Sequence, residues 1–274
     1  MSSTNNNIDI ISSVANPRIK EIRKLRNKKY RQQAGVFFAE GLRVVGEAIH
    51  QNADIICLVY STELLQSEFG KEIINSQTQN QFEILKVSKN VFESISNKDT
   101  PQGIGAVLYQ RFFHLEKMNE LKGTWVAIEG IQDPGNLGSI LRTMDAIGAN
   151  GFILLDDTTD PYHPTAIKAS MGAIFTIPIV ATKKEDFKLF IKQHPIQIIG
   201  TVCQNARDYR TIEFPKDMIL LMGSEQKGLS KDLLSVCDEL VHIPMIGTVD
   251  SLNISNAAAI FLYEIFSNHH KVFL

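Results

Sequence analysis

The sequence predicts an α/β protein in two parts: a small leading α/β domain, then a mostly parallel sheet with helices on both faces. Short apolar runs of strand length alternate with helical patterns, which is typical of a parallel sheet covered by helices. The alternation stops over residues 111–122, where the polarity is mixed and no period is clear, and then restarts. A length of 274 residues accommodates two ordinary domains. The predicted parts are a disordered stretch over 1–13, a leading domain over 14–110, a linker over 111–122 and a second domain over 123–274.

The leading domain begins with a predicted helix over 17–31, because Asn16 can cap its N-terminus and Pro17 suits its first turn. A second helix is expected to end near Gln51, and residues 62–75 read as helical or polar. Apolar runs that predict strands lie at 36–39, 55–60, 82–87 and 104–109.

The second domain alternates strands and helices more regularly. Its predicted strands are 125–128, 151–155, 174–180, 196–202, 218–222 and 240–243. Its predicted helices are 138–147, 164–171, 185–193 and 251–266. Since parallel sheets bind ligands at the carboxyl ends of their strands, polar segments that directly follow a strand are candidate sites.

The composition excludes several classes of protein. With 44% hydrophobic and 21% charged residues, the chain fits neither a disordered nor a fibrous protein. Three widely spaced cysteines, Cys57, Cys203 and Cys237, form no disulfide framework, which fits a reduced cytoplasm. No apolar run reaches the ~18 residues of a membrane span, and the polar start has no signal-peptide pattern. No histidine spacing is typical of a metal site, so we expect no metal. The cysteines, the lack of a membrane span and the polar start together predict a cytoplasmic protein without a membrane partner.

Charge is distributed unevenly although the net charge is only −2. Basic residues are concentrated in the first predicted helix, where only Glu21 opposes them. A solvated helix face is one interpretation; a surface that binds nucleic-acid phosphates is the other. The local patch rather than the net charge decides between them. The candidate residues for this nucleic-acid-binding surface are Arg18, Arg23, Lys24, Arg26, Lys28, Lys29 and Arg31.

Three polar segments follow strands of the second domain. Residues 129–142 combine glycines and Asp-Pro with Asn136 and Arg142. An ordinary strand-to-helix turn, which favours glycine and Asp-Pro, would also explain this composition. Residues 222–230 are glycine-rich, which allows a ligand close to the backbone, although an ordinary helix-entry loop is the alternative. Residues 243–256 place asparagines in an early helical turn, a local conflict that is typical of a functional site.

Other motifs are incomplete. Lys227 precedes its glycine, so the second segment is not a Walker phosphate loop. Residues 103–108 begin like a dinucleotide fingerprint but lack the third glycine, and no Gly-x-Ser-x-Gly elbow occurs.

In order along the chain, the three segments resemble the SpoU (TrmH-type) RNA 2′-O-ribose methyltransferases of the SPOUT superfamily. The motifs that carry the resemblance are Asp133-Pro134-Gly135-Asn136-Leu137-Gly138 with Arg142, Gly223-Ser224-Glu225 with Gly228-Leu229, and Ile243-Pro244-Met245 with Ser251-Leu252-Asn253-Ile254-Ser255. The leading domain is similar to that family's ribosomal-protein-like substrate-binding domain at Phe37-Phe38-Ala39-Glu40-Gly41 and Pro101-Gln102-Gly103. One departure is Asn256, where many relatives have an apolar residue.

The resemblance implies a parallel sheet whose C-terminal part forms a deep trefoil knot, a rare exception to unthreaded chain topology. It implies a homodimer that methylates a ribose 2′-hydroxyl of ribosomal or transfer RNA, with S-adenosylmethionine as cosubstrate. The implied cofactor-binding residues are Met222, Gly223, Gly228, Ile243, Met245 and Leu252. The implied catalytic residues are Arg142, Asn136, Glu225, Ser251 and Asn253.

The resemblance also implies roles for these residues. Arg142 matches the catalytic arginine, and because a guanidinium is very costly to deprotonate we expect it to hold a phosphate and stabilise the developing alkoxide rather than act as a base. Asn136 would orient Arg142 or the ribose, Glu225 would anchor that arrangement, and Ser251 and Asn253 would position the hydroxyl and the cofactor loop. The alternatives are an RNA-binding or ribosome-assembly factor that has lost turnover, and a general nucleotide-binding α/β enzyme.

Overall fold

The computed structural model describes residues 9–76, 82–118 and 120–270. Its contacts divide the chain into two compact units. The first contains the residues up to Gln110 together with Tyr162–Phe175, and the second contains Arg111–Pro161 and the residues from Thr176 onward. A short segment that lies within the second predicted domain along the sequence therefore packs with the first unit.

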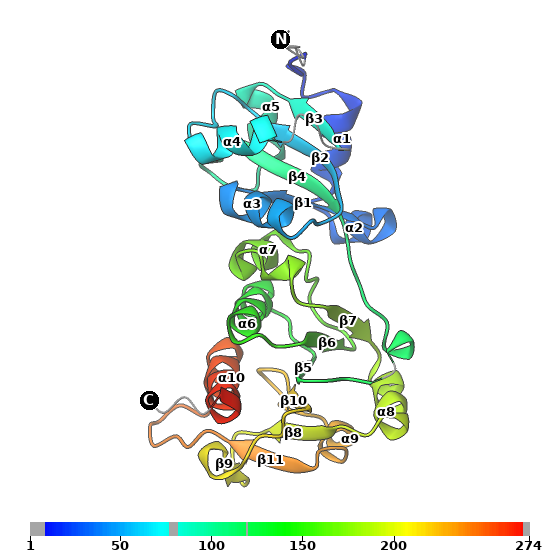
Figure 1. The fold of residues 1–274 in the computed structure, drawn as a ribbon, viewed down its shortest axis with the longest axis vertical. Helices are drawn as coiled ribbons and strands as arrows, with labels where there is room; N and C mark the ends of the chain where they lie inside the picture. Colours follow the sequence, from blue (N-terminus) through cyan, green and yellow to red (C-terminus); the bar gives the residue numbers. More distant parts are fainter. Residues whose placement is uncertain (1–8, 77–81, 119, 271–274) are drawn as a thin grey trace. The chain divides into compact units, whose positions relative to one another are not determined.

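The first unit is built on a four-stranded sheet with the order β1-β4-β2-β3 (Figure 1). β2 and β3 are parallel, whereas β4 runs antiparallel to both β1 and β2. The strands are β1 (Val36–Glu40), β2 (Ile55–Tyr60), β3 (Glu83–Lys86) and β4 (Ile104–Tyr109). The helices are α1 (Pro17–Lys24), α2 (Lys28–Ala34), α3 (Leu42–His50), α4 (Glu68–Ser76), α5 (Lys89–Ile95) and α7 (Pro164–Ser170), with the 3-10 turn η2 (Ala173–Phe175).

The second unit is built on a seven-stranded sheet with the order β7-β6-β5-β10-β8-β11-β9. Every pairing in it is parallel, so the predicted parallel sheet is confirmed. The strands are β5 (Thr124–Glu129), β6 (Gly151–Leu155), β7 (Ile179–Thr182), β8 (Gln197–Thr201), β9 (Arg207–Asp208), β10 (Met218–Met222) and β11 (Glu239–His242). The helices are α6 (Pro134–Ile147), α8 (Lys184–Gln193), α9 (Lys231–Leu234) and α10 (Ile254–His270), with the 3-10 turns η1 (Leu115–Lys117) and η3 (Tyr209–Thr211).

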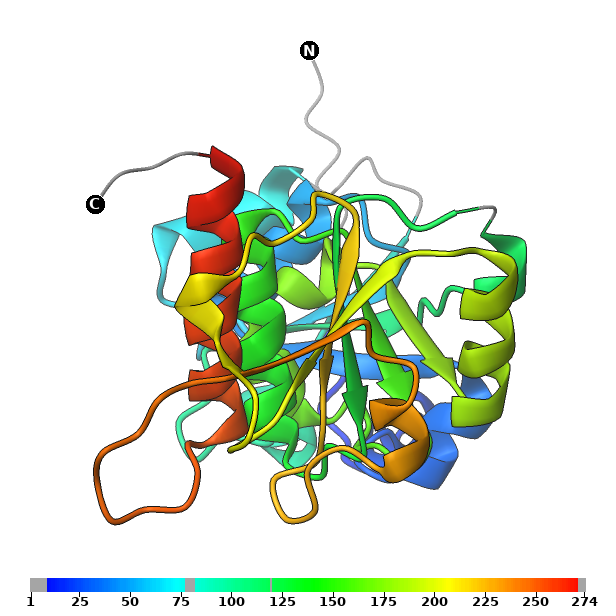
Figure 2. The same ribbon diagram turned by 90° about the horizontal axis from the view of Figure 1, so that it is seen from below.

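Helices cover both faces of the seven-stranded sheet. Figure 2 shows α10, in red, alongside α6, in green, on one face, and α8, in yellow-green, on the other. On the α8 face, Phe187 and Phe190 belong to one buried cluster with alternate strand residues such as Ile153 and Leu221. Burial on two faces explains why these strands read as continuous apolar runs rather than as alternating ones.

The predicted helix over 17–31 is wrong, because the chain forms two helices there. α1 ends at Lys24, and the side chain of Asn27 accepts hydrogen bonds from the backbone N–H groups of Lys29 and Tyr30, which begins α2. Capping of this kind competes with continuation of a helix, and asparagine favours the cap over the helix interior.

The predicted strand over 174–180 is also too long. Gly172 has a left-handed φ of +110°, and the chain then makes η2 before Pro178. Proline cannot donate to a sheet ladder, so β7 begins only at Ile179. Likewise, the predicted helix over 138–147 begins earlier, at Pro134, with Asp133 as its cap.

The first residues that the structure describes pair with β3. Ile11 donates its N–H to the carbonyl of Lys86 at 2.9 Å and forms an isolated bridge with Val87. This ordered contact lies within the stretch over 1–13 that is predicted to be disordered; residues 1–8 lie outside the described residues. No helix in the described ranges is long and apolar enough to cross a membrane.

Candidate functional site

The three polar segments meet at the carboxyl edge of the parallel sheet. The first follows β5 and runs into α6, the second follows β10, and the third joins β11 to α10. β5 and β10 are neighbours in register, so the starts of the first two segments emerge side by side. The packing of α10 against α6 brings the end of the third segment to the same place.

Asn136 stands at the centre of a polar cluster that joins all three segments. Its side-chain Nδ2 donates to the Glu225 carboxylate, and its Oδ1 accepts a 3.1 Å hydrogen bond from Nδ2 of Asn253. The Oδ1 of Asn253 in turn accepts from the backbone N–H of Ser255 at 2.9 Å and from its hydroxyl at 2.6 Å. This Asn136 cluster (Asn136, Glu225 and Asn253) uses both ends of the Asn136 amide, which fixes its orientation.

The turn of the second segment requires glycine. A Cβ on Gly223 would lie 2.0 Å from the carbonyl carbon of Gly228 and 2.2 Å from the N of Leu229, both of them backbone atoms. Gly228 has a left-handed φ of +63°, and its N–H donates to the carbonyl of Ser224 at 2.9 Å. The backbone therefore folds on itself here and leaves its polar groups close to the adjacent cavity.

That cavity, which we call the Gly223 cavity, has a volume of about 650 Å³. Its walls come from the ends of β8 and β10, the second and third segments, and the start of α10. The lining includes all six residues that the sequence assigns to cofactor binding, namely Met222, Gly223, Gly228, Ile243, Met245 and Leu252, and also Glu225 and Ser251. The volume and the mixture of apolar side chains with a few polar groups are typical of a site for one small molecule.

The remaining catalytic candidates lie outside this lining. Asn136 borders the cavity through Glu225, which it contacts and which lines the cavity, and Asn253 lies between the lining residues Leu252 and Ile254. Arg142 is exposed on α6, about 9 Å along the helix axis from Asn136 at 1.5 Å per residue. Among the described residues its guanidinium has no hydrogen-bond or ion-pair partner, so its positive charge is available to a ligand. Asn256 is exposed and does not line the cavity.

A partly buried ion-pair group links the first two segments beside the site. Glu129, at the end of β5, accepts a 2.7 Å hydrogen bond from the N–H of Ser230 and lies 3.6 Å from the Lys184 ammonium. Partial burial opposes charge on Lys184, but Glu129 and the nearby Asp156 and Asp232 outweigh it and raise the pKa of Lys184. This group ties the first segment to the end of the second. No sequence signal indicates it, because its members are scattered along the chain.

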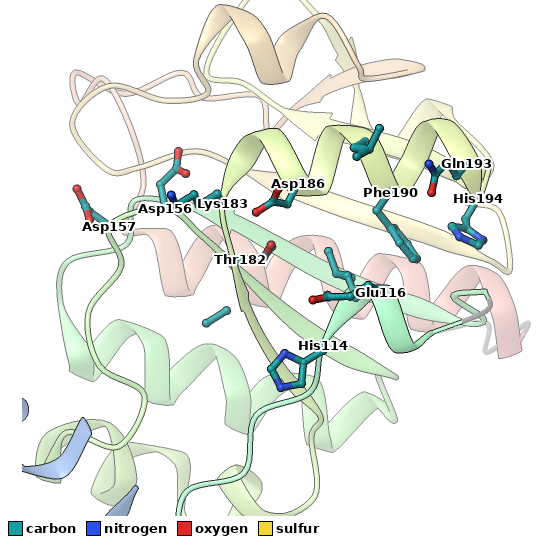
Figure 3. A pocket seen from close by; sticks show the side chains of 13 residues that line it. His114, Glu116, Asp156, Asp157, Thr182, Lys183, Asp186, Phe190, Gln193 and His194 are labelled. Carbon is teal, nitrogen blue, oxygen red and sulfur yellow. The ribbon is translucent and has the colours of Figure 1, made fainter. Parts of the chain in front are cut away.

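A larger cavity of about 990 Å³ lies elsewhere in the second unit (Figure 3). Its side chains come from the region of η1, the carboxyl ends of β6 and β7, and α8, and include Asp156, Asp186 and His194. No residue of the three motif segments lines it. We therefore place the candidate site at the smaller Gly223 cavity, where the motif residues gather.

Most of the basic side chains predicted to bind RNA form hydrogen bonds or ion pairs with other groups of the first unit. Arg18 pairs with Glu83, Arg23 donates to Ser94, and Lys24 pairs with Glu21 at 2.7 Å.

Arg31 corrects the predicted RNA-binding set, because it is only 1% exposed. Its guanidinium donates to the carbonyls of Leu25 and Arg26 at 2.8 and 2.9 Å, where α1 ends. These carbonyls have no intrahelical partner at a helix end, and Arg31 satisfies them. Lys28 and Lys29 remain exposed, and Arg26 donates to the carbonyl of Ser96.

The described residues contain no group of three or more His, Cys, Asp or Glu side chains that could hold a metal.

Comparisons with known proteins extend over nearly the whole chain. Residues 16–106 match the MRM3-like substrate binding domain, and residues 123–263 match the SpoU rRNA Methylase family. The 23S rRNA (guanosine(2553)-2′-O)-methyltransferase RlmP of Bacillus subtilis is 29% identical over 255 residues, which are 93% of this chain and 98% of that protein.

Solved structures of similar fold cover both units. An AdoMet-bound rRNA methyltransferase from Sinorhizobium meliloti superposes with a TM-score of 0.86 at 36% identity, over 96% of this chain and 98% of the other. The SpoU methyltransferase AviRb from Streptomyces viridochromogenes, in complex with AdoMet, has a TM-score of 0.83 at 27% identity, over 93% and 98% of the two chains. Motifs, fold and whole-chain similarity agree, and the chain belongs to the SpoU rRNA methylase family.

Proposed function

We propose that the protein is an enzyme that transfers a methyl group from S-adenosylmethionine to a ribose 2′-hydroxyl of ribosomal RNA. The observation that carries the proposal is the Asn136 cluster, which joins three distant motif segments directly beside the Gly223 cavity. The relatives support the substrate class, since RlmP and the Sinorhizobium meliloti protein are named as rRNA methyltransferases, and two of the solved structures hold AdoMet.

The residues of the Gly223 cavity fit S-adenosylmethionine. The glycine cradle at Gly223, which any Cβ would fill, leaves backbone N–H and C=O groups to recognise a polar ligand edge. Met222, Ile243, Met245 and Leu252 supply an apolar wall for its flat and aliphatic parts. When bound, the cofactor supplies a methyl group on a sulfonium centre that is already activated for transfer.

The protein's own contribution is to align the hydroxyl and to stabilise the charge that develops on it. An arginine side chain stays protonated at neutral pH, so Arg142 would hold the RNA phosphate and stabilise the forming alkoxide. The hydroxyl proton would then leave to solvent or to a phosphate oxygen. Ser251 on the cavity wall would position the hydroxyl, and the Asn136 cluster would hold the first and third segments in register.

Changing Asn136 to Asp is expected to lower turnover about tenfold to 100-fold at pH 8. The variant places a second carboxylate against Glu225 where an amide N–H donated, and two adjacent carboxylates repel each other. Because that repulsion raises the pKa of the pair, one proton is taken up as the pH falls and the hydrogen bond returns. The ratio of variant to wild-type turnover should therefore rise as the pH is lowered from 8 to 5.5. A ratio that is flat over this range would contradict the assigned role of the cluster.

We also propose that the enzyme works as a homodimer, which the family resemblance implies. Apolar side chains that a dimer could cover are exposed in the third segment and on α10, namely Ile246, Val249 and Tyr263.

A knot in the C-terminal part of the chain, which the family resemblance also implies, belongs to the same proposal. It is supported by the position of β10 between β5 and β8, and by the return of α10 to α6.

The proposed function is tested by mapping 2′-O-methylation. Ribosomal and transfer RNA from a strain that lacks the gene should lose one modified ribose, and the purified protein with radiolabelled S-adenosylmethionine should restore it. Loss of a ribosomal site supports the proposal, and loss of a transfer RNA site moves the substrate to that class. If no RNA accepts the label and no site is lost, the chain is instead a binding or assembly factor that has lost turnover.

A further inference from the structure

The first unit contains a cavity of about 680 Å³ that the catalytic motifs do not use. Its walls are the end of β1, the loop over 97–102, the start of α7, and Arg26. We call it the Lys98 cavity. Its volume is within the range of small-ligand sites, and all of its lining residues belong to the first unit.

The loop that forms one wall is held firmly to β1 and α3. The Glu40 carboxylate accepts a 2.6 Å hydrogen bond from the Ser96 hydroxyl and a 3.0 Å hydrogen bond from the N–H of Asn97. On the other side, Oε1 of Gln102 accepts from the N–H of Leu42 at 3.1 Å. These bonds tie the loop at both ends, so the wall exists before any ligand binds.

Gly41 allows Lys98 to lie against the backbone. Its φ is +115°, and a Cβ there would lie 2.7 Å from the Lys98 Nζ. The Lys98 ammonium donates to the carbonyl of Glu40 at 3.3 Å, which uses one of its three protons. The ammonium is thus placed at the cavity with donors to spare.

Three cations face the cavity without an ion-pair partner. Arg26, Lys98 and Lys168 all line it, and none of them forms a salt bridge within the described ranges. Glu40 is also part of the lining, but hydrogen bonds from the loop already use both of its carboxylate oxygens. Asp99 is the second carboxylate, and its side chain is exposed. The lining thus holds three cations and two carboxylates, and no cation is paired with either carboxylate. This surplus of positive charge favours an anionic ligand, and guanidinium and ammonium groups are the usual phosphate ligands.

The rest of the lining fits the other parts of a nucleotide. Phe38 and Ile167 are almost fully buried behind the cavity, the half-buried Pro164 offers apolar surface, and polar side chains such as Thr100 and Gln102 surround it. A ligand with a phosphate, a flat apolar face and a polar edge combines these features. A duplex keeps its bases stacked and out of reach, whereas loops and bulges of RNA present unstacked bases to proteins.

We propose that the Lys98 cavity receives one unstacked nucleotide of the RNA substrate, with its phosphate held by Arg26, Lys98 and Lys168 and its base against Pro164. This inference rests on the proposed function, since it names the form of RNA that the enzyme selects. The face of α1 is a weaker candidate for this role, since Arg18 and Lys24 are ion-paired there, whereas Arg26 donates only to the carbonyl of Ser96.

The test compares two charge-reversed variants of the full-length protein. Lys98→Glu with Lys168→Glu alters the cavity, and Lys71→Glu with Lys89→Glu makes the same charge change in the same unit away from the cavity lining. The probes are a mixed-sequence single-stranded RNA and a duplex of equal length, with affinity measured by fluorescence anisotropy over a salt series. We expect the cavity variant to bind the single strand at least about tenfold more weakly, with a salt slope that is less steep by about one. The control pair should remain within about twofold of wild type.

Two further measurements keep the result independent of folding and of catalysis. Lys168→Glu alone breaks no hydrogen bond or ion pair, because the exposed Lys168 has none among the described residues, and it should still weaken single-strand binding. Photocrosslinking of wild-type protein to 4-thiouridine in the single strand should label peptides that contain residues 97–102 or 163–168. Equal losses in both double variants, unchanged affinity in the cavity variants, or crosslinks confined to other segments would overturn the inference. Methyl transfer by the wild-type protein is scored separately, so the proposed function can fail or stand independently of this result.

Discussion

Replacing Arg142 by alanine is expected to reduce methyl transfer at least about 100-fold, because the variant removes a permanent positive charge from the place where the alkoxide forms. Arg142 is exposed and has no hydrogen-bond or ion-pair partner among the described residues. Its removal should therefore leave the melting temperature almost unchanged. The Gly223 cavity does not include Arg142, so calorimetry with S-adenosylhomocysteine should give a dissociation constant within about twofold of wild type.

Two companion variants make the result specific. Arg142→Lys keeps the charge but loses the planar fork that matches a phosphate, so its turnover should lie between those of alanine and wild type. Lys192→Ala removes another exposed cation from the second unit and should keep wild-type turnover. If Arg142→Ala keeps near-normal turnover on the RNA that is mapped as substrate, the catalytic assignment is wrong.

The second large effect is expected for Gly223→Ala, which should abolish measurable cofactor binding. A methyl group at this position would lie 2.0–2.4 Å from backbone atoms of Gly228 and Leu229, a distance at which one strand of the turn must move. Backbone cannot rotate away as a flexible side chain can, so the turn and the adjacent cavity wall must change shape. Calorimetry with S-adenosylhomocysteine measures the loss, and turnover should fall with it.

Gly247→Ala is the matched control for this variant. Gly247 lies in the third segment, its φ is not left-handed, and a Cβ there meets no atom within 4 Å. The same chemical change should therefore leave cofactor affinity and turnover close to wild type. A Gly223→Ala protein that binds S-adenosylhomocysteine normally would show that the cofactor does not use this cavity.

Local patterns predicted most of the strands. The apolar runs at 55–60, 104–109, 151–155 and 218–222 coincide with β2, β4, β6 and β10. Buried strands must be apolar along their whole length, so composition alone reveals them. The helices were harder to delimit, because caps and tertiary contacts rather than periodicity set their ends. Asn27 divides the first predicted helix, and the helix predicted over 251–266 runs instead from Ile254 to His270.

Two side chains show the limit of reasoning from residue type. Arg31 has a guanidinium, a usual phosphate ligand, and lies in the basic cluster of the sequence. It is nevertheless buried, and its guanidinium donates to carbonyls at the end of α1. Lys98, in contrast, stands apart from the basic cluster in the sequence and still meets Arg26 and Lys168 at one cavity. Charge along the chain predicts that a basic surface exists, and only the packing decides which cations reach it.

The sequence by itself determined the two-part α/β organisation, the parallel sheet and the three motif segments, because periodicity, glycine placement and motif order are local properties of the chain. It could not determine that Asn136, Glu225 and Asn253 touch, since the hydrogen bonds that join them span 89 and 117 positions. That contact exists because parallel strands end at one edge of the sheet and α10 packs beside α6. The tertiary structure likewise decided where the Gly223 and Lys98 cavities lie, because each is lined by segments that are distant in sequence and become neighbours only when the sheets form.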